Sequence, residues 1–130
     1  MREAALQNYK NLGGTFGEQW ILKYCWPVLT QQQNDISYLN RLTILFGIVA
    51  LADSVSVDTV KTKFMPMLSS LQKDPIANVR LNVAKTLSAL STTVKQNKDC
   101  TEQTKLILKS LQADKDRDVT FYAQKALKLF

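Results

Sequence analysis

The sequence has no histidine and few residues of the kinds that build chemical sites or break helices, with two cysteines, three prolines and four glycines in 130 residues. Histidine is the commonest metal ligand and a frequent general base, and Cys25 and Cys100 are too far apart in the sequence to form a CxxC pair. No apolar run reaches the roughly 18 residues that a membrane helix needs. These absences argue against a zinc site and against a membrane protein.

The cysteines and the N-terminus also bear on the cellular compartment. Secreted proteins usually contain paired cysteines, whereas two lone thiols are typical of a reducing compartment. The first residues form a polar amphipathic stretch without the apolar core of a signal peptide. We therefore expect a cytoplasmic protein, with a nuclear location as an open alternative.

Motifs of catalysis are absent as well. The chain has no Gly-x-Ser-x-Gly, no phosphate-binding loop and no cluster of metal ligands. The acidic group Asp114, Asp116 and Asp118 resembles a calcium loop, but Val119 and Lys125 stand where such a loop needs glycine and glutamate. We expect no catalytic residue, no bound cofactor and no metal site, so the chain is predicted not to be an enzyme.

The net charge is +6, from 17 basic and 11 acidic side chains. Nucleic-acid-binding proteins usually concentrate positive charge on one face and add arginine or aromatic readers. Here the lysines are scattered along the chain and there are only four arginines. The pattern favours an ordinary solvated surface over a nucleic-acid-binding one.

Apolar residues recur at steps of three and four through the whole chain, which is the periodicity of helices packed on one side. No stretch alternates long enough to need a strand, and Asn-Gly and Asp-Gly hairpin signals are absent. We therefore predict an all-α fold of seven helices, at roughly 1–12, 18–32, 37–53, 57–72, 76–92, 99–112 and 117–130.

Two details of these helices carry expectations of their own. In 18–32 the apolar stripe places Trp20 and Tyr24 in the core and leaves Trp26 partly exposed. Pro27 and Pro66 fall inside equivalent helices, where each should bend the helix by removing a backbone hydrogen bond.

The chain repeats itself at intervals of 39 and 40 residues. A shift of 39 aligns Asp35 with Asp74 and Arg41 with Arg80, and a further 40 aligns Asp74 with Asp114. Pairs of antiparallel helices with a period of about 40 residues are typical of HEAT solenoids. We predict a single α-α superhelix over 1–130, with about three and a half repeats: the second helix of a truncated repeat at 1–17, then full repeats at 18–56, 57–95 and 96–130.

The repeated aspartate and the arginine six positions later lie at the turn inside each repeat. Stacking should bring the arginine of one repeat close to the aspartate of the next, which predicts a ladder of charge-assisted hydrogen bonds. The last repeat has Thr120 in place of the arginine. A last repeat has no following aspartate to bind, which is consistent with that exchange.

Four segments resemble one family: "REAALQNYKNL", "YLNRLTILFGIVAL", "MPMLSSLQKDPIANVRLNVAKTL" and "DVTFYAQKAL". They are similar to the C-terminal HEAT repeats of the scaffold (A, regulatory) subunits of protein phosphatase 2A, in register over essentially the whole chain. This resemblance and the half repeat at the start imply a piece of a longer array. The chain departs from the family at Ile36, where proline is usual, and in its positive charge.

The resemblance implies the function and the partner. In that family the last repeats hold the phosphatase catalytic subunit through the turns between paired helices, and upstream repeats, absent here, hold the variable regulatory subunit. Carried over by position, the partner-binding residues are Tyr38, Arg41, Ile76 and Asn78. Tyr38 can instead pack on its own helices, and Arg41 can serve both the ladder and the partner. The alternative function is a transport or chromosome-associated HEAT adaptor that binds acidic protein or nucleic acid.

Overall fold

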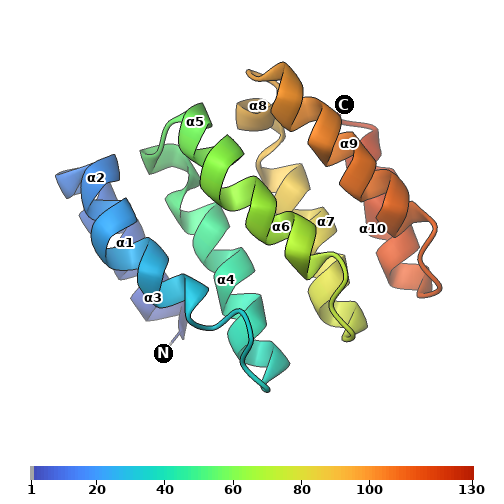
Figure 1. Cartoon of the computed structure of the whole chain (residues 1–130), viewed down its shortest axis with the longest axis horizontal. Helices are drawn as coiled ribbons and strands as arrows, with labels where there is room; N and C mark the ends of the chain where they lie inside the picture. The colour runs from blue at the N-terminus through green and yellow to red at the C-terminus, as the bar shows by residue number, and fades with distance from the viewer. Residues whose placement is uncertain (1) are drawn as a thin grey trace. The chain divides into compact units, whose positions relative to one another are not determined.

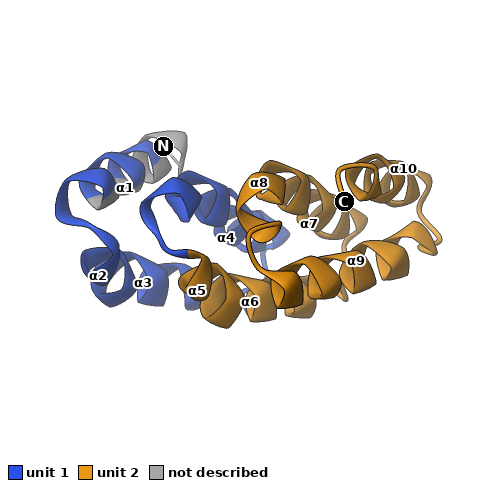
Figure 2. Ribbon diagram, turned by 90° about the horizontal axis from the view of Figure 1, so that it is seen from above, with its two compact units in different colours: residues 1–56 blue, residues 57–130 orange. Residues whose placement is uncertain are grey.

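A computed structural model describes the backbone of residues 2–130 and the side chains of residues 7, 8, 10–12 and 14–130. All secondary structure in this part of the chain is helical (Figure 1), which confirms the predicted all-α class. Within residues 2–130, no helix is both long enough and apolar enough to cross a bilayer. The chain divides into two compact units, residues 1–56 and 57–130 (Figure 2), and the division falls between the first and second predicted full repeats.

The first unit contains one long N-terminal helix and one helix pair. It consists of α1 (Arg2–Phe16), α2 (Glu18–Trp20), the π-helical turn Ile21–Cys25, α3 (Trp26–Thr30), α4 (Tyr38–Leu51) and the 3₁₀ turn Ala52–Ser54. The segments from α2 to α3 form one continuous helical rod that packs on α4. Gly47 of α4 makes close packing possible, since a Cβ there would lie 2.6 Å from Cδ1 of Leu29.

The second unit contains two helix pairs. It consists of α5 (Val57–Thr59), the π-helical turn Val60–Phe64, α6 (Met65–Leu71), α7 (Ala77–Ala89), α8 (Ser91–Val94), α9 (Lys98–Gln112) and α10 (Arg117–Leu127). Within this unit α6 lies beside α9 in one layer, and α7 lies beside α10 in the other (Figure 2). The predicted apolar faces are buried between the layers: Val60, Phe64, Met67, Leu68, Leu71, Val79, Val83, Leu87, Leu90, Ile107, Leu108 and Leu111.

The two internal prolines follow π-helical turns in both units. Each turn begins six residues before its proline, and the π-type bonds run from Trp26 N to Ile21 O and from Met65 N to Val60 O. A proline cannot donate a backbone hydrogen bond, and its ring collides with the preceding turn of a regular helix. The wider π turn accommodates the ring, and the bend expected at each proline stays a prediction.

The π turn also explains why the aromatic prediction was wrong. Trp26 is buried, with 9% of its surface exposed, whereas Tyr24 is 52% exposed and Trp20 is half-buried. A π turn contains more residues than the 3.6 of an α-helical turn. Every residue after it therefore lies at a different angle around the helix axis from the one that a 3.6-residue period predicts. The buried positions therefore recur at steps of four, at Ile21, Cys25 and Leu29.

The first helix continues past its predicted end. The sequence predicts an end near residue 12, before two glycines, but α1 runs to Phe16. The helix is interrupted instead at Gly17, whose φ is 88° and ψ is −178°. Glycine adopts this conformation readily and other residues adopt it rarely, so the third glycine of the segment, rather than the first two, separates α1 from α2.

Candidate partner-binding surface

Each of the three turns between paired helices is closed by its aspartate. The carboxylate Oδ1 of Asp35, Asp74 and Asp114 accepts the backbone N–H two residues later, at 2.9, 2.9 and 2.8 Å respectively. This bond forms an Asx turn, which directs the chain into the following helix. The sequence repeat of 39 and 40 residues is therefore a repeat of one hydrogen-bonded turn.

A second bond crosses every turn, and its donor is the residue six positions after the aspartate. Nη1 of Arg41 donates to the carbonyl oxygen of Asp35 at 2.6 Å, and Nη1 of Arg80 donates to that of Asp74 at 2.7 Å. In the last turn the hydroxyl of Thr120 donates to the carbonyl oxygen of Asp114 at 3.0 Å. Thr120 thus keeps the bond within the turn although it replaces an arginine.

The predicted ladder is present inside the second unit. Nε of Arg80 lies 2.7 Å from Oδ2 of Asp114, and Nη2 lies 3.2 Å from Oδ1, which makes the pair bidentate. About a tenth of each side chain is exposed. Desolvation raises the pKa of Asp114, but the hydrogen bonds from Arg80 and from the backbone of Asp116, with the positive charges nearby, lower it further than burial raises it.

The turn of the first unit carries the largest exposed apolar side chains of the three turns. Ile36 is 99% exposed, Tyr38 at the start of α4 is 39% exposed, and Leu39 beside it is exposed to a similar degree. Arg41 lies in the same helix, three residues after Tyr38, but is only 9% exposed, because its guanidinium donates to the carbonyl groups of Asp35 and Ile36. Its role in the turn is thus observed, and its contact with a partner stays a prediction.

The carboxylate of this first turn is also perturbed. The backbone N–H of Ser37 and the side chain of Asn40 hold the pKa of Asp35 below its usual value, with the positive charge of Arg41 as a smaller cause. The negative charge therefore persists to lower pH than for a free aspartate. The same carboxylate closes the turn that directly precedes α4, which begins at Tyr38.

The first turn of the second unit presents a mixed surface. Ile76, which directly precedes α7, is 38% exposed, and Asn78 in the first turn of that helix is exposed as well. The side-chain amide of Asn82 donates to the backbone and side-chain oxygens of Asn78 at 2.8 and 3.1 Å. Asn78 is thus held by a neighbour one turn further along α7.

The last turn is charged rather than apolar. Lys115, Arg117 and Asp118 are all exposed, and the side chain of Asp116 caps α10 by accepting the backbone N–H groups of Asp118 and Val119. Charged side chains at an interface rim contribute less to affinity than a central apolar anchor does. The apolar anchors that the structure describes at the turns therefore lie before this last turn.

Sequence reasoning missed Ile36 as a candidate contact. It stands where Pro75 and Lys115 stand in the next two turns, and it was noted only as a departure from the family pattern. The available signal was a β-branched apolar residue directly after a turn aspartate, where burial is not expected. Among the residues that the structure describes, no group of three or more potential metal-binding side chains comes together.

Comparison with known proteins gives two relatives. The A-type regulatory subunit of protein phosphatase PP2A from Saccharomyces cerevisiae is 33% identical over 131 aligned residues, which cover 91% of this chain and 20% of the yeast protein. The protein of the same name in Schizosaccharomyces pombe is 32% identical over 75 residues, which cover 58% of this chain and 13% of that protein. No family model matches.

The chain therefore spans about a fifth of the length of the first of these relatives. The segments that resemble the scaffold subunits extend through both units, and the turns built on Asp35, Asp74 and Asp114 lie among them. The resemblance predicted from these segments is confirmed: over most of its length this chain is related to the A-type regulatory subunits of protein phosphatase 2A, and it matches a part of them.

Proposed function

We propose that the chain is a non-catalytic scaffold segment that binds the catalytic subunit of protein phosphatase 2A through the turns between its paired helices. Support for the scaffold role comes from its relation to proteins that are named regulatory subunits. That relation also favours this function over a transport or chromosome-associated adaptor. Under this proposal a variable regulatory subunit would bind repeats outside this chain, and the assembly would act in the cytoplasm.

The single observation that supports the choice of surface is the exposure of apolar side chains at turns that are otherwise rigid. Ile36 and Tyr38 lie on a turn whose aspartate and arginine are both hydrogen-bonded within it. A rigid apolar anchor loses little conformational entropy on binding, and tyrosine is enriched among residues that dominate interface energies. Ile76 offers a second anchor of this kind in the other unit.

The experiment is a calorimetric titration of the chain with purified protein phosphatase 2A catalytic subunit. The test variant is Tyr38→Ala/Ile76→Ala/Asn78→Ala, with Ile36→Ala as a separate variant. We expect the triple variant to bind about 30-fold more weakly or worse, the effect of losing one interface residue worth about 2 kcal/mol. All three side chains are exposed, so helical content by circular dichroism should not change.

The matched control is Phe46→Ala/Val49→Ala, which also removes exposed apolar side chains but in the later part of α4, away from the turns. It should bind as the unaltered chain does. Equal affinity of the triple variant and the control would reject the assigned residues. Failure of the unaltered chain to bind would contradict the proposal that these repeats hold the catalytic subunit by themselves.

Arg41 needs a different test, because Arg41→Ala would also open the turn that it closes. Arg41→Lys keeps the charge but loses the fork that reaches two carbonyl groups. If the residue serves only the turn, this variant should lower the unfolding temperature and leave the affinity unchanged. If the variant loses more free energy of binding than free energy of unfolding, Arg41 contacts the partner as well.

A further inference from the structure

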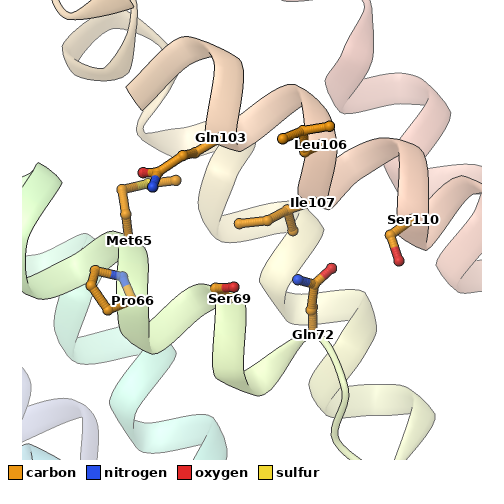
Figure 3. A pocket seen from close by; sticks show the side chains of 8 residues that line it. All are labelled: Met65, Pro66, Ser69, Gln72, Gln103, Leu106, Ile107 and Ser110. Carbon is orange, nitrogen blue, oxygen red and sulfur yellow. The ribbon is translucent and has the colours of Figure 1, made fainter. Parts of the chain in front are cut away.

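A groove of about 430 Å³ lies between α6 and α9 in the second unit. Met65 and Ile107 are buried and form its apolar floor, and Pro66 and Leu106 stand exposed on its two sides. Figure 3 shows Gln103 near one end of the groove and Gln72 near the other. Its volume is within the range of small-molecule and cofactor pockets in proteins.

The groove occurs where two equivalent helices differ. With the shift of 40 residues, Leu106 of α9 stands at the position of Pro66 in α6. The helix before Pro66 widens into a π turn over Val60–Phe64, whereas α9 is a regular α-helix from Lys98 to Gln112. Two helices whose backbones follow different paths cannot stay in contact along their whole length. We therefore attribute the groove beside Pro66 to the π turn that precedes this proline.

The groove contains a polar atom that lacks a partner. Oε1 of Gln72 is buried and accepts no hydrogen bond from any described residue. In Figure 3 this side chain rises from the end of α6 toward Ile107 and Ser110. A buried acceptor without a donor is unfavourable, so this atom favours a ligand that brings an N–H group.

Positive charge lies beside the groove, on α9. Lys105 and Lys109 flank Leu106 on the outer face of α9, where Leu106 is 68% exposed, and Glu102 is the one acidic side chain beside them. Neither lysine forms an ion pair with a described residue, in contrast to Lys61, which lies 3.1 Å from Asp99.

The unit that contains the groove is also the positively charged one. Residues 57–130 contain 13 basic and seven acidic side chains, whereas residues 1–56 contain four of each, so the whole net charge of +6 belongs to the second unit. A ligand for the groove is therefore expected to be acidic.

We propose that this groove is a docking site for an acidic peptide segment of a partner protein. One apolar side chain of the peptide would cover Met65 and Ile107 between Pro66 and Leu106. A peptide N–H would donate to Oε1 of Gln72, and flanking carboxylates would lie near Lys105 and Lys109. The site uses none of the four residues predicted to contact the phosphatase, so it is independent of the proposed function.

A peptide fits the groove better than a nucleic acid does. Surfaces that bind single strands combine positive charge with aromatic side chains on which bases stack, and arginine often reads the bases. The lining has neither an aromatic residue nor an arginine. It offers instead an apolar floor and an amide acceptor, which match a side chain and a main-chain N–H.

The test is fluorescence anisotropy with a panel of labelled dodecapeptides, titrated with the whole chain. Each peptide has one or two central Leu, Ile or Phe residues flanked by Asp and Glu, and each has a counterpart with Lys in place of the acids. We expect binding of acidic members only. The variant Lys105→Glu/Lys109→Glu should weaken it about tenfold or more, the effect expected when charge pairs at an interface are reversed.

The matched control is Lys125→Glu/Lys128→Glu, which makes the same change in net charge on exposed positions outside the groove. It should weaken binding less than twofold. Gln72→Met, which removes the acceptor and keeps the side-chain length, should weaken binding without lowering the unfolding temperature. Nitrogen–proton correlation spectra of the 14.7 kDa chain should show the side-chain amide signals of Gln72 and Gln103 shifting with the peptide.

Three results would overturn the proposal. The first is no binding by any acidic peptide of the panel at low salt. The second is equal weakening by the two charge reversals, which would show attraction to net charge alone. The third is displacement of the peptide by single-stranded RNA or duplex DNA at lower concentration than by unlabelled peptide, which would assign the groove to nucleic acid.

Discussion

Three residues at one register position, Arg41, Arg80 and Thr120, make the same bond with different chemistry. Each donates to the carbonyl oxygen of the residue six positions earlier. Arginine has donors left over after this bond, and Arg80 uses two of them on Asp114. Threonine has a single donor. Threonine in place of arginine therefore keeps the turn closed but leaves no donor for the aspartate of a following turn.

Replacing Arg80 by methionine tests the value of the ladder bond. The change leaves the carboxylate of Asp114 largely buried without its partner. We expect a loss of about 3 kcal/mol in the free energy of unfolding, the lower end of what breaking a buried pair costs. Urea denaturation measures it, and the double variant Arg80→Met/Asp114→Asn should recover part of the loss, because asparagine keeps the acceptor that closes the turn and removes the buried charge. A loss below about 1 kcal/mol would place the pair with surface ion pairs.

The lowered pKa of Asp114 predicts an acid-sensitive contribution to stability. Burial raises the pKa, but the hydrogen bonds from Arg80 and Asp116 bring it below the ordinary value of 3.8. Between the two values the unfolded chain binds more protons than the folded chain, so stability falls as the pH drops through this range. The contribution is complete above about pH 4.

The measurement is the unfolding temperature of the chain and of Asp114→Asn between pH 6 and pH 2.5. The variant should be less stable near neutral pH and should lose less stability below pH 4 than the unaltered chain does. Parallel curves for the two proteins would contradict the assignment. Asp35, whose pKa is also lowered, is present in both and does not affect the comparison.

At the scale of the elements, the helix boundaries depend on single residues that the apolar pattern does not reveal. The pattern places the helices at 57–72, 99–112 and 117–130 close to where they occur. It ends the first helix too early, because three nearby glycines look alike in the sequence. Only the backbone shows that Gly17 alone has positive φ.

Gly17→Ala and Gly14→Ala should have opposite effects on stability. Alanine at position 17 must adopt a φ of 88°, a conformation that costs about 1–3 kcal/mol for a residue with a Cβ. Alanine at position 14 lies inside α1 with open space around it, and should stabilise the helix by up to about 1 kcal/mol. Thermal unfolding of both variants measures the difference, and equal effects would place the break elsewhere.

At the scale of the whole molecule, the change of period from 39 to 40 residues has a definite location. Leu51 and Leu90 align at a shift of 39, and Leu68 and Leu108 align at a shift of 40. The additional residue therefore lies between α7 and α9, where the chain forms the short α8 and a turn. A connection absorbs an extra residue without rotating the buried face of either helix.

Insertion of one serine tests this reading of the repeat. Placed between Lys95 and Gln96, in the connection, it should change the free energy of unfolding by less than about 1 kcal/mol. Placed between Val83 and Ala84, it turns the rest of α7 by about 100° and moves Leu87 out of the core. We expect that second variant to unfold or to lose several kcal/mol, and urea denaturation of both would decide. Similar losses would contradict the distinction.

The sequence alone was sufficient for the fold class, the repeat and most of the buried faces. Helical periodicity follows from burial on one side of each helix, so Phe64, Leu68, Val83 and Leu87 could be placed in the core from their spacing. The recurring aspartate could be placed at a turn because its side chain binds local backbone N–H groups. The four predicted partner residues came from the family resemblance, and their roles stay a prediction.

Tertiary structure decided the features that depend on local departures from regular geometry. A π turn cannot be read from apolar spacing, so the burial of Trp26 and the exposure of Tyr24 were missed. The groove beside Pro66 depends on how two helices with different paths pack, and the buried oxygen of Gln72 depends on that packing too. Periodicity records which face of an element is buried on average, whereas side-chain exposure at one position depends on the path of the backbone around it.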